Sequence, residues 1–359
     1  MAHIFRKHTP DSKGIVVLTH KEIEPSRWAH PPSRELPFFE SRLTDKYFIG
    51  VHHGSQPQYY PNLNKAISFF MASPTQAGFG SHVPFFIPFN SRSFLPSFFK
   101  PLTTPKYWDI INVSRNIPLK RLDIFIKSVR QLYDQGNFYK VLLIVPTEER
   151  ELRGDGDAPD IVKQYESSFS LEEQQHFTLL KLTPEFRGAG LPLRTIAHFY
   201  NSSKVFAILS DREGESRVIH EALCCGLPIV CNKELVGGGR DFLNSSNSVQ
   251  FSNYTTVAPA LKEAVERSGS TLTVEVEDVS KFLLAENTLP ILKDLFSKLY
   301  DHFGEKFDCD APLLNTDNLP FRLPGHHLEV PWYDAEVYPH GADILSCSQC
   351  ETLFQELRI

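Results

Sequence analysis

Two carboxylates stand on a segment whose pattern predicts a loop that leads into a helix. Glu213 and Glu221 are separated by seven residues. An apolar run at 205–209 predicts a strand before them, and the amphipathic stretch after them ends at 226–228 (Gly-Leu-Pro), before another apolar run. The spacing places Glu213 beside the helix N-terminus and Glu221 about two turns into the helix. This βαβ pattern puts the loop at the carboxyl end of a strand, where open α/β sheets bind ligands.

Such a loop suits a ligand that carries both hydroxyl groups and phosphates. Carboxylates accept hydrogen bonds from hydroxyl groups, and the backbone N–H groups at a helix N-terminus bind phosphate. The alternative is a helix N-terminus with incidental acidic residues in an unrelated α/β protein.

The segment from Ser210 to Val230 resembles the Glu-x7-Glu signature of the retaining glycosyltransferases of family 4, which have the two-domain GT-B fold. The matching residues are Ser210, Glu213, Gly214, Ser216, Glu221, Ala222, Gly226, Pro228, Ile229 and Val230. The resemblance implies that Glu221 holds the ribose of a nucleotide-sugar donor and that Glu213 contacts the donor sugar as a catalytic residue. It also implies contacts from the backbone of Gly214, Glu215, Ser216 and Arg217.

A second part of the family pattern lies upstream, between a predicted strand at 109–113 and a predicted helix at 121–133. The family has Gly-Arg-x4-Lys-Gly at this loop, and its Arg and Lys hold the donor diphosphate. Arg115 and Lys120 keep the five-residue offset, whereas Ser114 and Arg121 replace the two glycines. Two cations here suit a diphosphate leaving group, because they neutralise the charge that grows as the sugar departs. Two solvated surface cations are the alternative.

Further segments follow in the family's order. A Gly-Gly turn is expected at Gly237 and Gly238, where the backbone closes on the phosphates. A short return strand is expected at 247–251, and the loop at 183–188 occupies the place where the family contacts the nucleotide base.

Strands and helices alternate from residue 109 to about 251, which predicts a doubly wound parallel sheet. The fold class expected from the resemblance is α/β, with two Rossmann-like domains and a nucleotide-sugar cleft between them. We expect an abbreviated acceptor-side domain at 1–104, a nucleotide-sugar-binding domain at 105–286, and a crossover helix with a Pro-rich tail at 287–359. The first domain is shorter than the family's usual one and lacks its Gly-Gly loop.

His52 and His53 follow a predicted strand at 46–51 and are acceptor-site candidates; a structural role or simple exposure is the alternative. Residues 1–110 carry 12 Lys and Arg against 7 Asp and Glu. This excess would suit an anionic acceptor or peripheral contact with a membrane surface, and ordinary variation explains it equally well.

The composition, 41% hydrophobic and 22% charged residues among 359, is typical of a globular protein, and no apolar run reaches the length of a membrane span. The N-terminus lacks the apolar core of a signal peptide, and six cysteines do not form a disulfide framework, so we expect a reducing cytoplasmic setting. Cys347 and Cys350 form a single Cys-x-x-Cys pair, for which zinc binding stays open. We expect no metal and no cofactor, with cationic side chains in the place of a divalent ion.

The predicted activity is transfer of a sugar, with retention, from a UDP- or GDP-type donor to a saccharide, glycolipid or other hydroxyl acceptor. Polysaccharide, lipopolysaccharide or glycolipid assembly is the implied setting, and no nucleic-acid partner is expected. A sugar-nucleotide epimerase or glycosyl phosphorylase, or a non-catalytic nucleotide-sugar-binding or scaffold protein of the same fold, is the alternative.

Overall fold

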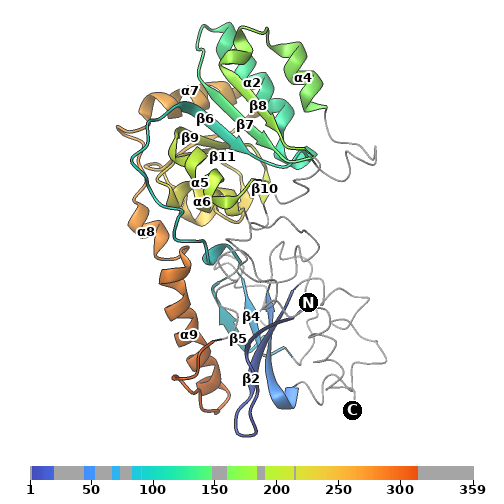
Figure 1. The fold of residues 1–359 in the computed structure, drawn as a ribbon, viewed down its shortest axis with the longest axis vertical. Helices are drawn as coiled ribbons and strands as arrows, with labels where there is room; N and C mark the ends of the chain where they lie inside the picture. The colour runs from blue at the N-terminus through green and yellow to red at the C-terminus, as the bar shows by residue number, and fades with distance from the viewer. Residues whose placement is uncertain are drawn as a thin grey trace. The chain divides into compact units, whose positions relative to one another are not determined.

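The computed structural model describes residues 2–19, 44–52, 67–72, 83–89, 91–147, 160–183, 191–213 and 216–313. These residues form two compact units (Figure 1). One unit holds the described residues up to 97 together with 281–313, and the other holds those from 98 to 280.

The unit at 98–280 is built on a six-stranded sheet in which every pair of neighbouring strands is parallel. In chain order the strands are β6 (Trp108–Val113), β7 (Val141–Val145), β8 (Phe177–Lys181), β9 (Ser203–Ile208), β11 (Ile229–Asn232) and β13 (Ser248–Phe251). Their order across the sheet is β13-β11-β9-β6-β7-β8. The chain therefore builds outward on one side of β6 and then returns to build on the other side, which is the strand order of a doubly wound sheet.

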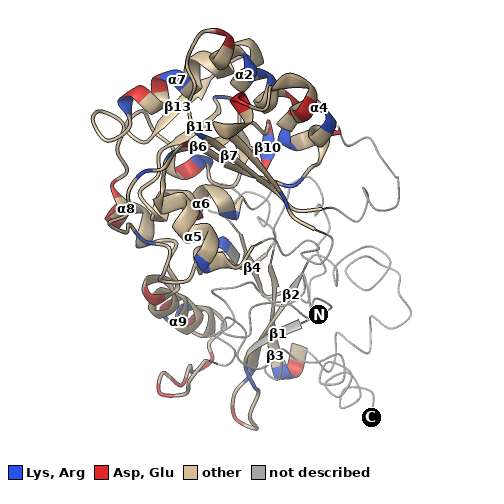
Figure 2. Cartoon of the chain, turned by 45° about the horizontal axis from the view of Figure 1, so that its top comes forward, with Lys and Arg blue, Asp and Glu red and all other residues tan. Residues whose placement is uncertain are grey.

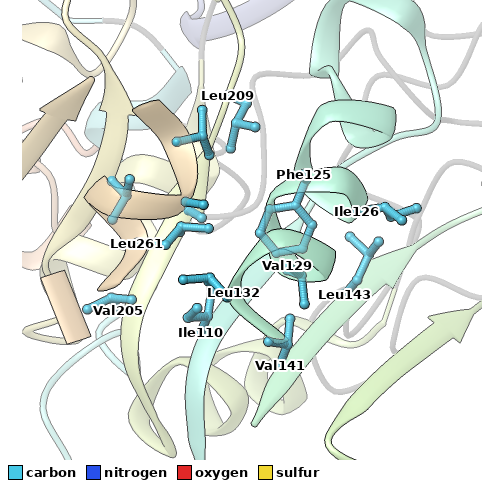
Figure 3. Close-up of a cluster of buried hydrophobic side chains, with 14 of the residues drawn as sticks. Ile110, Phe125, Ile126, Val129, Leu132, Val141, Leu143, Val205, Leu209 and Leu261 are labelled. Atoms are coloured by element: carbon cyan, nitrogen blue, oxygen red, sulfur yellow. The ribbon is translucent and has the colours of Figure 1, made fainter. Parts of the chain in front are cut away.

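Helices cover both faces of this sheet, as doubly wound topology requires. On one face lie α2 (Leu122–Asp134), α4 (Ile161–Ser168) and α7 (Val257–Arg267), and on the other lie α5 (Leu193–Asn201) and α6 (Arg217–Cys224); α8 (Val276–Ser280) contacts α6. The apolar positions of α2 recur at helical spacing, so Phe125, Ile126 and Val129 are buried against Ile110 and Leu143 of the strands (Figure 3). Figure 2 marks Lys, Arg, Asp and Glu residues along α2, α4 and α7.

The other unit is built on a five-stranded sheet with the order β1-β2-β3-β4-β5. Its strands are β1 (Ala2–Arg6), β2 (Gly14–Thr19), β3 (Tyr47–His52), β4 (Phe69–Met71) and β5 (Phe85–Ile87). The strands from β2 to β5 are parallel, and β1 pairs with β2 in antiparallel orientation. The long helix α9 (Ala285–His302) packs its Phe296 and Tyr300 into the apolar core of this sheet. Helix α9 therefore joins the N-terminal sheet in one unit although most of the chain separates them.

Most elements predicted from the sequence are present within a residue or two of the expected bounds. The differences are physical. β1, β4 and β5 are too short or too weakly alternating to be recognised from their own residues, and they gain stability only as members of the sheet.

Candidate active site

The candidate site lies where the order of the six strands reverses, between β6 and β9. The loops that leave the carboxyl ends of these two strands diverge to opposite halves of the sheet, and such a switch point is where doubly wound sheets bind ligands. The loop after β6 runs through residues 114–121, and the loop after β9 runs through 209–216. These two loops carry the residues predicted to act on the donor diphosphate and sugar.

An ion pair joins the two loops. Lys120 is the last residue of the 3₁₀ turn η4 (Pro118–Lys120), and Glu213 is the last residue of the two-residue strand β10 (Arg212–Glu213). The Lys120 Nζ lies 2.5 Å from Glu213 Oε1, and the two side chains are only 12% and 7% exposed. The structure thus brings together two predicted catalytic residues that are 93 positions apart in the chain.

A glycine allows the neighbouring strand to lie close to the backbone of Glu213. β10 pairs in parallel with β12 (Val236–Gly237), with Gly237 opposite Glu213. Gly237 has φ +100°, and a Cβ at this position would lie 1.7 Å from the backbone oxygen of Glu213. Any side chain at residue 237 would therefore push β12 away from β10. Gly238 follows it and is buried.

Asp211, two residues before Glu213, binds four other segments. Its carboxylate accepts hydrogen bonds from Arg121 Nη2 at 2.8 Å, from Asn232 Nδ2 at 2.9 Å and from the Tyr254 hydroxyl, and its backbone oxygen accepts one from Val236 N at 3.0 Å. Partial burial opposes ionisation, but these hydrogen bonds, from Tyr254 and Arg121 above all, hold the pKa of Asp211 below its usual value of 3.8.

Glu221 is buried on α6. Its Oε1 lies 3.5 Å from Arg217 Nε, and its Oε2 accepts a hydrogen bond from the Tyr200 hydroxyl at 3.5 Å. Burial, together with the charge of Glu221, raises the pKa of Tyr200 well above 10. Because α6 begins at Arg217, four residues after Glu213, Glu221 lies about one turn into the helix, and the prediction of two turns was wrong.

The remaining predicted residues are placed less centrally. Arg115 is exposed on the same loop as Lys120, and Ser216 is buried at the N-cap position of α6. His52 lies outside the expected loop: it is the last residue of β3 and is buried, because the pairing with β2 and β4 continues through it. His53, Gly214, Glu215, Cys347 and Cys350 lie outside the described residues, as does most of the predicted base-contact loop at 183–188.

Sequence reasoning missed three residues of the site: Arg121, Asp211 and Tyr254. Arg121 and Asp211 stand directly beside predicted residues, so their positions gave a signal. The sequence shows of Arg121 only that it stands where the family pattern has glycine. Tyr254 belongs to η8 (Tyr254–Thr256) after β13, and nothing in its local pattern marks it.

Two other kinds of feature are absent from the described part of the chain. No group of three or more His, Cys, Asp or Glu side chains there could hold a metal ion. No helix among those residues is long and apolar enough to cross a bilayer.

Comparison with known proteins agrees with this architecture. Residues 95–268 match the model of the family described as "Glycosyl transferases group 1". No curated protein matches the chain. The matched segment contains every element of the candidate site, from the loop after β6 to η8.

Solved structures share the fold at low sequence identity. The sucrose-phosphate synthase (tll1590) from Thermosynechococcus elongatus has a TM-score of 0.52 at 14% identity, over 73% of this chain and 70% of that one. Anabaena Alr3699/HepE, solved with UDP and glucose, has a TM-score of 0.51 at 16% identity, over 73% and 75%. The pneumococcal O-GlcNAc transferase GtfA, solved with UDP and GlcNAc, has a TM-score of 0.51 at 14% identity, over 76% and 55%.

The chain thus has the α/β architecture of the GT-B proteins, with parallel pairing throughout the six-stranded sheet and from β2 to β5 in the five-stranded sheet. The family match covers residues 95–268, which is less than half of the chain, and the structural neighbours, at 14–16% identity, show the fold. The chain covers 55% of the matched chain in the GtfA/B complex, 55% of the pneumococcal GtfA and 53% of TarM, and so spans about half the length of these neighbours.

Proposed function

We propose that this chain is a retaining glycosyltransferase that moves a sugar, of the hexose type, from a nucleotide-diphosphate donor to a hydroxyl acceptor. The observation that carries the proposal is the Lys120–Glu213 ion pair at the switch point of the six-stranded sheet. Two structural neighbours were solved with UDP bound, which favours a UDP-type donor over a GDP-type one.

Lys120 is proposed to stabilise the departing diphosphate. Its ammonium group has three N–H donors, so it can remain bound to Glu213 and still donate to phosphate oxygens. The charge on those oxygens grows as the bond to the sugar breaks, and a cation fixed in a largely buried place stabilises that change most. Arg115, exposed on the same loop, is proposed as the second cation.

The other proposed contacts come from the family resemblance. Glu213 and the backbone of 214–217 are proposed to contact the donor sugar, and Glu221 the ribose hydroxyl groups. The backbone at Gly237 and Gly238 is proposed to approach the phosphates, because no Cβ stands in the way there. We keep His52 and His53 as acceptor-side candidates.

The acceptor is proposed to be a saccharide, a glycolipid or another hydroxyl compound, in polysaccharide, lipopolysaccharide or glycolipid assembly. The basic excess in the first 110 residues would allow peripheral contact with an anionic membrane surface. The described cysteines 224, 225, 231 and 309 are free thiols, in keeping with a reducing cytoplasmic setting.

We also propose that transfer needs no metal ion, with Lys120 and Arg115 neutralising the diphosphate. Turnover should then persist in EDTA. A loss of turnover that Mg²⁺ or Mn²⁺ restores would contradict this part of the proposal.

The test of the function is a screen of UDP- and GDP-sugars with a panel of hydroxyl acceptors. We expect transfer from one donor class, and NMR of the first product should show the donor's anomeric configuration. Lys120→Ala should lower turnover about 100-fold, as the removal of a preorganised charge donor does. Donor binding without any transfer would favour a binding protein, and conversion of the donor alone would favour an epimerase.

A further inference from the structure

Arg121 has an unusual backbone conformation for its residue type. Its φ of 52° and ψ of 38° lie in the left-handed region. Among the described residues, Arg121 is the one residue other than glycine that has a positive φ. It directly follows Lys120 and stands at the N-cap position of α2, where the family pattern has glycine. A left-handed arginine is strained, so its side chain must contribute something that glycine would not.

The side chain of Arg121 reaches the loop after β9. Its Nη2 lies 2.8 Å from Asp211 Oδ2, and its Cζ lies 5.5 Å from the centre of the Tyr254 ring. Asp211 in turn accepts hydrogen bonds from Tyr254 and from Asn232. The loop after β6 is thereby tied to the loop after β9, to β11 and to η8.

This second ion pair runs beside the first. Arg121 is one residue after Lys120, and Asp211 is two residues before Glu213, so the same two loops are joined twice. We propose that Arg121, Asp211 and Tyr254 form a positioning network that holds Lys120 and Glu213 in register before a donor binds. The effect of this network on turnover rests on the proposed function, because that function assigns Lys120 its role. The ordering of the loop rests only on the contacts described above.

Because Arg121 and Asp211 are partly exposed, their ion pair is expected to affect the position of the loop more than the free energy of unfolding. The side chains of Arg121 and Asp211 are 41% and 40% exposed, and ion pairs in contact with water contribute little to the free energy of unfolding. Their loss should therefore leave stability almost unchanged. It should instead free the loop that carries Lys120, and a misplacement of about 1 Å at a reacting centre can lower turnover up to about 100-fold.

The chain offers a clean variant and a matched control. Arg121→Gly removes the side chain and also relieves the strain, because glycine adopts positive φ readily. Arg130→Ala is the control: Arg130 makes an ion pair at 3.0 Å to Asp134 and another at 2.7 Å to Glu173, and it lies over the rings of Tyr133 and Phe169, away from the two loops.

The decisive experiment is a double-mutant cycle of Arg121→Gly with Lys120→Ala, read as turnover. If Arg121 acts through Lys120, Arg121→Gly lowers turnover by about tenfold to 100-fold in the wild-type chain and has no further effect in the Lys120→Ala chain. Asp211→Asn should match Arg121→Gly, and Arg130→Ala should keep wild-type turnover. Effects of Arg121→Gly and Lys120→Ala that multiply, or wild-type turnover in Arg121→Gly, would overturn the inference.

Hydrogen exchange of residues 114–121 in the ligand-free chain gives a readout that does not depend on activity. We expect faster exchange in Arg121→Gly and Asp211→Asn, and wild-type exchange in Arg130→Ala. Unchanged exchange in the first two variants would refute the positioning network. If the wild-type chain transfers no sugar while this exchange pattern is observed, the proposed function fails and the network stands.

Discussion

Substitution of Gly237 by alanine tests the packing that places Glu213. Alanine at this position would meet two separate costs. Its Cβ would stand 1.7 Å from the backbone oxygen of Glu213, and its φ of +100° lies in a region that L-residues rarely adopt.

The two costs can be separated with Gly136, which has φ +80° at the end of α2 and no atom within 4 Å of the place where a Cβ would stand. Gly136→Ala therefore carries the conformational cost alone, about 1–2 kcal/mol. Gly237→Ala adds an overpacking cost of about 1–3 kcal/mol. Since β12 has only two residues, the chain can also respond by detaching β12 from β10, which would limit the loss of global stability and displace Glu213.

Urea unfolding and nucleotide titration of both variants measure these effects. We expect Gly237→Ala to unfold at lower urea than Gly136→Ala, or to unfold alike but bind UDP or GDP at least tenfold more weakly, a loss of about 1.4 kcal/mol. Gly136→Ala should bind nucleotide like the wild-type chain. Equal stability and equal nucleotide affinity in the two variants would refute the reasoning.

Two further predictions concern ionisation. Because the pKa of Asp211 is lowered in the folded state, the contribution of its carboxylate to stability is complete above the usual pKa of 3.8 and is lost as the pH falls through the lower folded value. The difference in unfolding temperature between wild type and Asp211→Asn should therefore be small near neutral pH and vanish at acidic pH. A difference that grows toward low pH would contradict this. Burial raises the pKa of Cys225 and of Cys231 to about 12. At pH 8 these two thiols should therefore resist alkylation in the folded chain while the exposed Cys309 reacts, as peptide mass spectrometry can show. Rapid labelling of Cys225 or Cys231 in the folded chain would contradict this, because it would show that the end of α6 or the strand β11 opens.

The sequence predicted the elements of the unit at 98–280 well because their signals are local. Buried strands there are continuous apolar runs, and the helix at 122–134 repeats apolar residues at helical spacing. Glu213, Glu221 and Lys120 were predicted as site residues because they match the family pattern, and their roles stay predictions. The pairing of Lys120 with Glu213 follows once the strands are known to be adjacent.

What the sequence could not give depends on contacts between distant segments. Tyr254 reaches Asp211 from a turn 43 residues away, which no local pattern encodes. The left-handed conformation of Arg121 is set by its tertiary contacts against its own preference. His52 was expected in a loop because it is polar, but strand pairing on both sides extends β3 through it.

The proposed function requires a nucleotide diphosphate to bind beside Lys120. Calorimetric titration of UDP and GDP into wild type, Lys120→Ala and Lys127→Ala tests it most directly, since Lys127 is an exposed lysine of α2 that pairs with Asp123. We expect one nucleotide to bind wild type and Lys127→Ala equally and Lys120→Ala at least tenfold more weakly. Equal affinity in all three proteins, or no binding of either nucleotide to the wild-type chain, would contradict the account.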